Sequence, residues 1–167
     1  MPGGDGRSVA FDTPAGTVRA AAEWDAVSRR VRQVRFTNVP SFVVQGGLNI
    51  VCGGRHVRVD VAFGGAFYAI VDAESVGVAL DGTHLPELRR VGEQIKQAVE
   101  AVLTVKHPID ERLAGIYGTI FTGPARGASA DLRNVTVFAN AEVDRSPCGT
   151  GTAAVMPAVH PTGLLPS

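Results

Sequence analysis

The sequence predicts an α+β chain made mainly of antiparallel sheet with one long helix. Valine-rich segments alternate apolar and polar residues at the two-residue period of strands. Twenty glycines and ten prolines cut these segments short, which favours many strands joined by turns. Residues 86–106 instead repeat apolar side chains at spacings of three and four, the period of an amphipathic helix.

The first third of the chain predicts an antiparallel meander. Three segments read as successive strands, at residues 8–12, 17–23 and 31–37. Turn signals separate them at Pro14-Ala15-Gly16 and around Trp24-Asp25.

A second group of strands follows, at residues 42–44, 48–52, 56–63 and 66–71. The turn Gly53-Gly54-Arg55 has the composition of a common hairpin connection between two of them. Gly64-Gly65 then breaks an apolar run. Paired glycines at such a place indicate either a β-bulge, the interpretation we favour, or a close approach of other backbone.

The amphipathic helix has one apolar stripe, formed by Leu88, Val91, Ile95, Val99, Val102 and Leu103. Pro86 suits its first turn, and Pro108 is expected to stop it soon after the last apolar residue. Packing of this stripe against a sheet is enough to explain why it is apolar, so we do not infer that the helix binds a membrane or a partner.

The last third of the chain predicts two strands, at residues 117–121 and 134–140, joined by a surface loop at 122–130. A helix then begins near Ala153. Pro157 and Pro161 are expected to interrupt it, so it should be short or kinked.

The composition limits the function. The chain has 167 residues, 45% of them hydrophobic, which suits one compact domain. Its 16 Lys and Arg balance 16 Asp and Glu, so a small molecule or a protein is a better partner than nucleic acid or a membrane. No apolar run approaches the roughly 18 residues that cross a bilayer, and residues 1–6 do not resemble a signal peptide. We therefore expect a cytoplasmic location.

Candidate chemistry centres on residues 144–152, Asp-Arg-Ser-Pro-Cys-Gly-Thr-Gly-Thr. They predict a strand end, a glycine turn and a helix N-terminus, where unbonded N–H groups attract an anion. The positive end of the helix should also lower the pKa of the Cys148 thiol, which could act as base or nucleophile. A small core cysteine in an ordinary turn is the alternative. The segment matches neither a phosphate loop nor a dinucleotide fingerprint.

Other polar residues predict no further site. Cys52 and Cys148 lie far apart, so no disulfide framework is expected. Four histidines lack the spacing of metal ligands and suit surface or turn positions: His56, His84, His107 and His160. Four arginines without interleaved aromatics form a solvated face: Arg29, Arg30, Arg32 and Arg35.

Residues 144–152 resemble the second-cysteine motif of the proline racemase family, which includes proline racemase, hydroxyproline epimerase and trans-3-hydroxyproline dehydratase. Residues 34–42, 59–69 and 117–120 extend the resemblance over nearly the whole chain. It implies a diaminopimelate epimerase-like fold, a mostly antiparallel curved sheet around a central amphipathic helix. Residues 1–37 would be remnant strands of the family's first domain. Residues 38–167 would be the second domain without its C-terminal part.

The resemblance also implies roles for five residues. Cys148 matches one of two opposed acid/base thiols, while Gly149 and Thr150 match positions that bind the substrate carboxylate. Asp144 matches the residue that meets the ring nitrogen, and Phe138 a pocket-wall aromatic. No cofactor or metal is implied. The family's other thiol lies in a Met-Cys-Gly-His motif upstream of the segment where this chain begins, and Cys52-Gly53-Gly54 does not match it.

Three functions are compatible with these residues. The first is a cofactor-independent racemase or epimerase acting at the α-carbon of proline or hydroxyproline, incomplete in this chain. The second is trans-3-hydroxy-L-proline dehydratase, which Ala66-Phe67-Tyr68 favours and Cys148 disfavours. The third is a noncatalytic half that binds only a ligand or a partner. A homodimer, or association with a missing N-terminal half, is expected.

Overall fold

The computed structural model describes residues 7–162, in two compact units, Met1–Pro40 and Ser41–Ser167. The segment 1–6, on which the expectation about a leader rests, lies outside the described residues. The boundary between the units lies three residues after the domain boundary that the sequence predicts at residue 37. The assignment of each unit to a domain of the family is a proposal.

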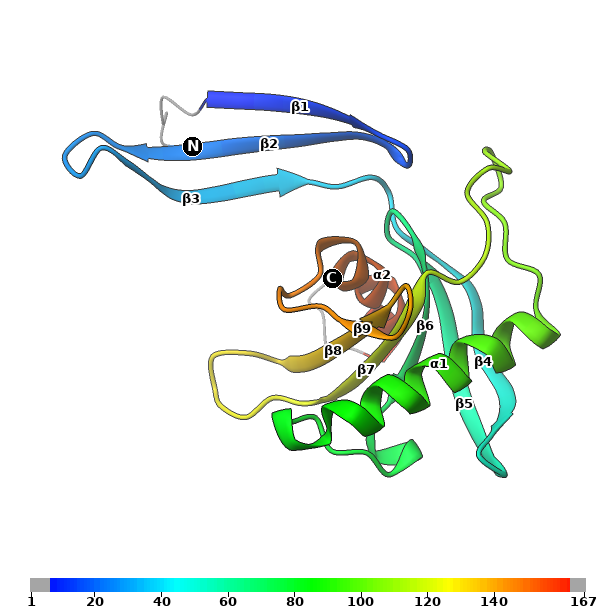
Figure 1. Cartoon of the computed structure of the whole chain (residues 1–167). Coiled ribbons are helices and arrows are strands. Elements are labelled where there is room, and N and C mark those ends of the chain that lie inside the picture. Colours follow the sequence, from blue (N-terminus) through cyan, green and yellow to red (C-terminus); the bar gives the residue numbers. More distant parts are fainter. Residues whose placement is uncertain (1–6, 163–167) are drawn as a thin grey trace. The chain divides into compact units, whose positions relative to one another are not determined.

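The first unit is a three-stranded antiparallel sheet in the order β1–β2–β3 (Figure 1). Its strands are β1 (Arg7–Thr13), β2 (Gly16–Asp25) and β3 (Arg30–Thr37). The Asp25 carboxylate closes the second turn by accepting hydrogen bonds from the Val27 N–H at 2.9 Å and the Ser28 hydroxyl at 2.8 Å. The predicted meander is confirmed.

One face of this sheet is apolar. Strand alternation and register place Val9, Ala20 and Phe36 opposite one another across the three strands. We call the large residues of this side the apolar sheet face; their exposed fractions run from 50% to 56% in Val9, Phe11, Trp24, Val31, Val34 and Phe36. A contiguous half-exposed apolar surface of this kind is typical of an interaction surface.

The second unit is a six-stranded sheet in the order β4–β5–β6–β7–β8–β9, mostly antiparallel, with β6 and β7 parallel. The strands are β4 (Phe42–Cys52), β5 (Arg55–Phe63), β6 (Phe67–Asp72), β7 (Gly118–Pro124), β8 (Leu132–Phe138) and β9 (Glu142–Val143). Between β6 and β7 the chain forms the 3-10 helices η1 (Glu74–Val76) and η2 (Gly82–His84) and the helix α1 (Leu85–Val102). These elements confirm the α+β class.

Helices pack on both faces of this sheet. The apolar stripe of α1 covers one face, where Gly92 lies so close that a Cβ there would be 3.0 Å from the Val137 Cβ. The Thr119 hydroxyl on that face donates a 2.8 Å hydrogen bond to the Gly92 carbonyl. Because neighbouring side chains alternate, Ile120 points to the other face. There it packs with α2 (Gly149–Val159), which continues into η3 (His160–Thr162).

Several predicted boundaries are wrong: α2 begins at Gly149 rather than near Ala153, and three further differences have a clear physical reason. α1 ends at Val102 rather than near residue 106, because Leu103 is extended and Lys106 then bridges to Ala114. Residues 122–124, expected in the loop, belong to β7, because they pair with β8 as far as Pro124. α2 continues past Pro157, whose fixed φ suits a helix and which removes one N–H donor without ending the helix here.

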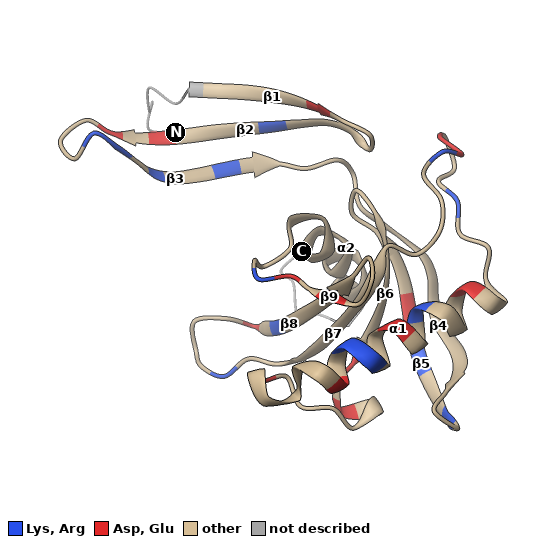
Figure 2. Ribbon diagram, in the orientation of Figure 1, with Lys and Arg blue, Asp and Glu red and all other residues tan. Residues whose placement is uncertain are grey.

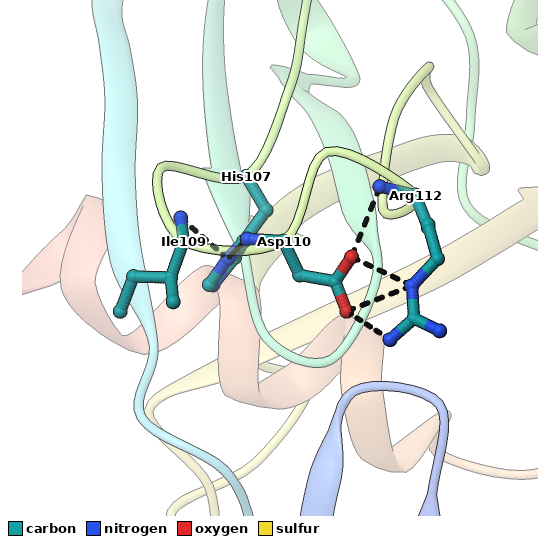
Figure 3. Close-up of polar contacts among 4 residues, drawn as sticks. All are labelled: His107, Ile109, Asp110 and Arg112. Atoms are coloured by element: carbon teal, nitrogen blue, oxygen red, sulfur yellow. Dashed lines mark hydrogen bonds and ion pairs between the residues drawn. The ribbon is translucent and has the colours of Figure 1, made fainter.

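The connection from α1 to β7 forms a compact polar turn (Figure 3). The Arg112 guanidinium binds the Asp110 carboxylate through two nitrogens, at 2.9 and 2.7 Å. These hydrogen bonds lower the pKa of Asp110 to about 2. His107 Nδ1 accepts from the N–H groups of Ile109 and Asp110 at 3.3 Å, and its ring packs 4.8 Å from that of Phe63. His107 is thus a loop residue, as predicted.

Charges of both signs are spread over the described elements, with acidic and basic residues along α1 (Figure 2). No helix within residues 7–162 is long and apolar enough to span a membrane.

Candidate functional site

Cys148 lies immediately before the first residue of α2, so the predicted glycine turn and helix N-terminus are present. Two linked hydrogen bonds hold the approach to the helix. The Cys148 N–H donates to the Ser146 hydroxyl at 3.1 Å, and that hydroxyl donates to Asp144 Oδ1 at 2.7 Å. The Thr152 N–H donates to the Cys148 carbonyl at 2.8 Å. Cys148 is buried, with 7% of the residue exposed.

The backbone of Cys148 has φ of 50°, a left-handed conformation that few non-glycine residues adopt. Such a conformation costs about 1–3 kcal/mol and persists only where the surroundings fix it. Here the hydrogen bonds to Ser146 and Thr152 fix it from both sides. The direction of the Cys148 side chain is therefore set by the hydrogen-bonded turn and not by the backbone conformation that a cysteine prefers.

Two glycines let α2 approach the sheet and let the thiol lie over the helix. A Cβ at Gly64 would be 2.3 Å from the Thr150 carbonyl oxygen and 2.4 Å from the Ala154 nitrogen. A Cβ at Gly151 would be 2.8 Å from the Cys148 sulfur. Because Phe63 pairs with Phe67 in regular register, the favoured bulge at Gly64-Gly65 is wrong, and a close approach of other backbone explains the pair.

Tyr68 is the site residue to which the sequence assigned no role. It is fully buried on β6, and its hydroxyl lies 2.7 Å from the Thr150 hydroxyl and 3.7 Å from the Cys148 sulfur. Burial raises the pKa of Tyr68 far above its ordinary value, so its hydroxyl stays protonated at neutral pH. No local pattern could link it to a thiol 80 residues away.

Three aromatic rings follow one another beside this turn. The ring of Tyr68 meets that of Tyr117 edge-on at 5.9 Å, and Tyr117 stacks on Phe138 at 5.6 Å. Phe138 is paired with Gly118, where a Cβ would lie 3.0 Å from the Phe138 Cβ. Phe138, which was predicted to line the pocket, is therefore connected to Cys148 by a row of contacts: it stacks on Tyr117, Tyr117 contacts Tyr68, and the Tyr68 hydroxyl lies near the sulfur.

Asp144 supplies negative charge next to the turn. Hydrogen bonds from the Ser146 side chain and N–H lower the pKa of this half-buried carboxyl, and the Cys148 thiol and Arg145 add smaller effects in the same direction. The carboxylate is thus ionised at neutral pH. In this structure Oδ1 accepts hydrogen bonds from the Ser146 N–H and the Ser146 hydroxyl.

The second cysteine lies elsewhere. Cys52 ends β4 and lines a cavity of about 260 Å³ with Arg55 and Arg90, against the α1 side of the sheet. Burial raises the pKa of the Cys52 thiol, with Arg90 opposing the effect. Both cysteines are free thiols in this structure. Among residues 7–162 no three His, Cys, Asp or Glu side chains are close enough to hold a metal ion.

The comparisons with known proteins agree on one family. The model of the family described as proline racemase matches residues 2–167. A trans-3-hydroxy-L-proline dehydratase from Bacillus thuringiensis subsp. konkukian is 46% identical over 151 residues, covering 90% of this chain and 45% of that protein. Proline racemase A from Trypanosoma cruzi is 37% identical over 160 residues, covering 94% of this chain and 38% of that protein.

A solved structure shows the same relation in three dimensions. The crystal structure of a hydroxyproline epimerase from Agrobacterium vitis with bound trans-4-hydroxy-L-proline superposes with a TM-score of 0.89 at 29% identity. The match covers 99% of this chain and 47% of that one. The chain thus spans less than half the length of the relatives it matches.

Proposed function

The chain belongs to the proline racemase family, and we propose from this that it supplies one acid/base thiol, Cys148, of a cofactor-independent racemase or epimerase. The substrate would be proline or hydroxyproline, and the reacting atom its α-carbon. One observation carries the proposal: Cys148 is held at the N-terminus of α2, within reach of Thr150 and of the Tyr68 hydroxyl. A buried thiol beside a helix end fits proton transfer next to a bound carboxylate.

Removal of an α-proton leaves negative charge that the carboxylate must share. The first turn of a helix has N–H groups without acceptors in the helix, and Gly149 and Thr150 carry two of them in α2. Such fixed donors stabilise the charge as it develops and need no rearrangement during the reaction. Asp144 would meet the ring nitrogen, which carries positive charge at neutral pH, and Phe138 would line the ring.

The proton balance requires two groups. A Cys148 thiolate would take the α-proton from one face of the substrate, and a thiol on the other face would return a proton to the planar carbanion, inverting the centre. Cys52 cannot be that second thiol, because it lines the cavity on the α1 side of the sheet. We propose that the second thiol comes from the part of the relatives that this chain does not match.

Dehydration of trans-3-hydroxy-L-proline is the alternative reaction, and the 46% identity with a dehydratase favours it. The same carbanion would expel the 3-hydroxyl as water once an acid supplies a proton. Cys148 would then serve as base without returning a proton to the α-carbon. The third candidate is a noncatalytic half that binds only a ligand or a partner.

We propose further that the apolar sheet face docks the part of the relatives that this chain does not match, or a second copy, since both would cover its exposed side chains. The free thiols are compatible with a cytoplasmic location.

The test is complementation. This chain is co-expressed with a family fragment that carries the Met-Cys-Gly-His motif, and the complex is incubated in D₂O with proline, 4-hydroxyproline or trans-3-hydroxy-L-proline. Deuterium at the α-carbon with inversion supports the isomerase, and loss of water from the 3-hydroxy substrate supports the dehydratase. Cys52→Ser is the matched control and should keep activity. A Cys148→Ala complex that still inverts the α-carbon or still releases water from the 3-hydroxy substrate would refute both reactions.

A further inference from the structure

Tyr68 is placed to handle the proton of the Cys148 thiol. Its hydroxyl has one proton to donate and lies between two groups that can each donate or accept, the Thr150 hydroxyl at 2.7 Å and the Cys148 sulfur at 3.7 Å. It is fully buried, so water does not compete for these bonds.

The arrangement has two consistent hydrogen-bond patterns. When Cys148 is a thiol, its S–H donates to the Tyr68 oxygen and Tyr68 donates to Thr150. When Cys148 is a thiolate, Thr150 donates to Tyr68, and Tyr68 donates to the sulfur. The first pattern uses the protons of the thiol and of Tyr68, and the second uses the protons of Thr150 and Tyr68. Once the thiol has lost its proton, the switch needs only rotation of two O–H bonds, with no movement of heavy atoms.

We propose that Tyr68 is a positioning residue that stabilises the Cys148 thiolate by reversing its hydrogen bond when the thiol loses its proton. The other side chains packed on the thiol from the sheet and helix are apolar, among them Ala62, Ile120 and Val155. Asp144 and Arg145 are the charged groups beside the turn, and the Asp144 carboxylate accepts a hydrogen bond from the Cys148 thiol. Tyr68 is therefore a neutral hydrogen-bond donor that can stabilise the thiolate among apolar side chains and beside a carboxylate.

Phenol ionisation does not complicate this role. Because burial raises the pKa of Tyr68, the hydroxyl remains a donor throughout the range in which a thiol titrates. The Thr150 hydroxyl then has a task besides any contact with a substrate carboxylate, since it completes the hydrogen bonding of Tyr68 in both states.

The meaning of this switch for catalysis rests on the proposed function, but the thiol can be measured directly. The experiment compares alkylation of Cys148 by iodoacetamide in the 167-residue chain and in Tyr68→Phe, resolved by mass spectrometry. Loss of a hydrogen bond to an anion should slow alkylation at pH 7 about five- to tenfold. The rate at high pH, where the thiolate is complete in both proteins, should be unchanged.

Two controls separate the hydrogen bond from a general loosening of the fold. Cys52 reports on folding in the same sample and should react equally in both proteins. Tyr117→Phe is the matched substitution, because its hydroxyl forms no hydrogen bond among the described residues, and it should leave the Cys148 rate unchanged. An unchanged neutral-pH rate in Tyr68→Phe, or an equal change in Tyr117→Phe, would overturn the proposal.

A second measurement needs no change at Tyr68. With tyrosine labelled by ¹³C at Cζ, the Tyr68 resonance should shift with pH in parallel with the rise in Cys148 alkylation, and this shift should vanish in Cys148→Ala. A Tyr68 resonance that ignores the thiol would refute the switch. Neither the alkylation rate nor the Tyr68 resonance depends on substrate turnover. A negative result in either would therefore count against the hydrogen-bond switch and not against the proposed function.

Discussion

Replacement of Gly64 by alanine tests how α2 is seated on the sheet. The new Cβ would meet backbone atoms of α2 at 2.3 and 2.4 Å, and backbone cannot rotate away as a side chain does. Ordinary contacts need about 3.5 Å, so α2 would have to move by about 1 Å. That movement would lengthen the 2.7 Å contact between the hydroxyls of Tyr68 and Thr150.

The expected cost follows from overpacking, which destabilises by about 1–3 kcal/mol. Alanine also lowers the conformational entropy of the unfolded chain, which stabilises the folded state by about 0.4–1 kcal/mol. This gain applies here because Gly64 does not have the positive φ that alanine would disfavour. The net loss should therefore be about 1–2 kcal/mol, a fall in Tm of about 2–8 °C for a chain of this size.

The assay is thermal unfolding followed by circular dichroism, with Gly127→Ala as the matched control. A Cβ at Gly127 meets no atom within 4 Å, so this variant should unfold within about 0.5 kcal/mol of the parent. Equal stability of the Gly64 and Gly127 variants would show that α2 does not rest on Gly64, and would refute the seating of the thiol derived from it.

Three further outcomes are expected. Cys148, at a helix N-terminus, should be alkylated at lower pH than Cys52, whose pKa burial raises; equal pH profiles would remove the effect of the helix end. The Asp110 carboxyl should titrate near 2 by NMR and move towards its ordinary value of about 3.9 in Arg112→Ala, so its ion pair is lost only as pH falls through about 2. The apolar sheet face should cause self-association that Phe36→Thr weakens in sedimentation velocity, whereas a strictly monomeric parent would contradict its role.

Local patterns predicted most of the strands and α1, because the spacing of apolar residues that identifies a strand or a helix lies within a short stretch of sequence. The Gly53-Gly54 hairpin is an example: both glycines have positive φ, 57° and 78°, which few other residues adopt at such a turn. The single strand β4 was expected as two pieces, since register shifts between Gln45 and Leu48 hide the alternation of a continuous strand.

The candidate site divides in the same way. Its turn could be predicted because Asp144 to Thr150 lie within seven positions of the sequence. Tyr68 received no role because its contacts with Cys148 and Thr150 arise only when β6 and α2 pack together. The close approach at Gly64 likewise depends on a helix that begins 85 residues later, so the sequence left two explanations open.

The central claim is that Cys148 serves one face of the substrate. The most direct measurement follows α-deuterium uptake from D₂O separately for L-proline and D-proline, in the complex of this chain with the complementary fragment. In Cys148→Ala, uptake should be lost from the enantiomer whose α-proton faces Cys148 and should persist in the other, because the opposed thiol remains. Uptake at the parental rate from both enantiomers would contradict the claim.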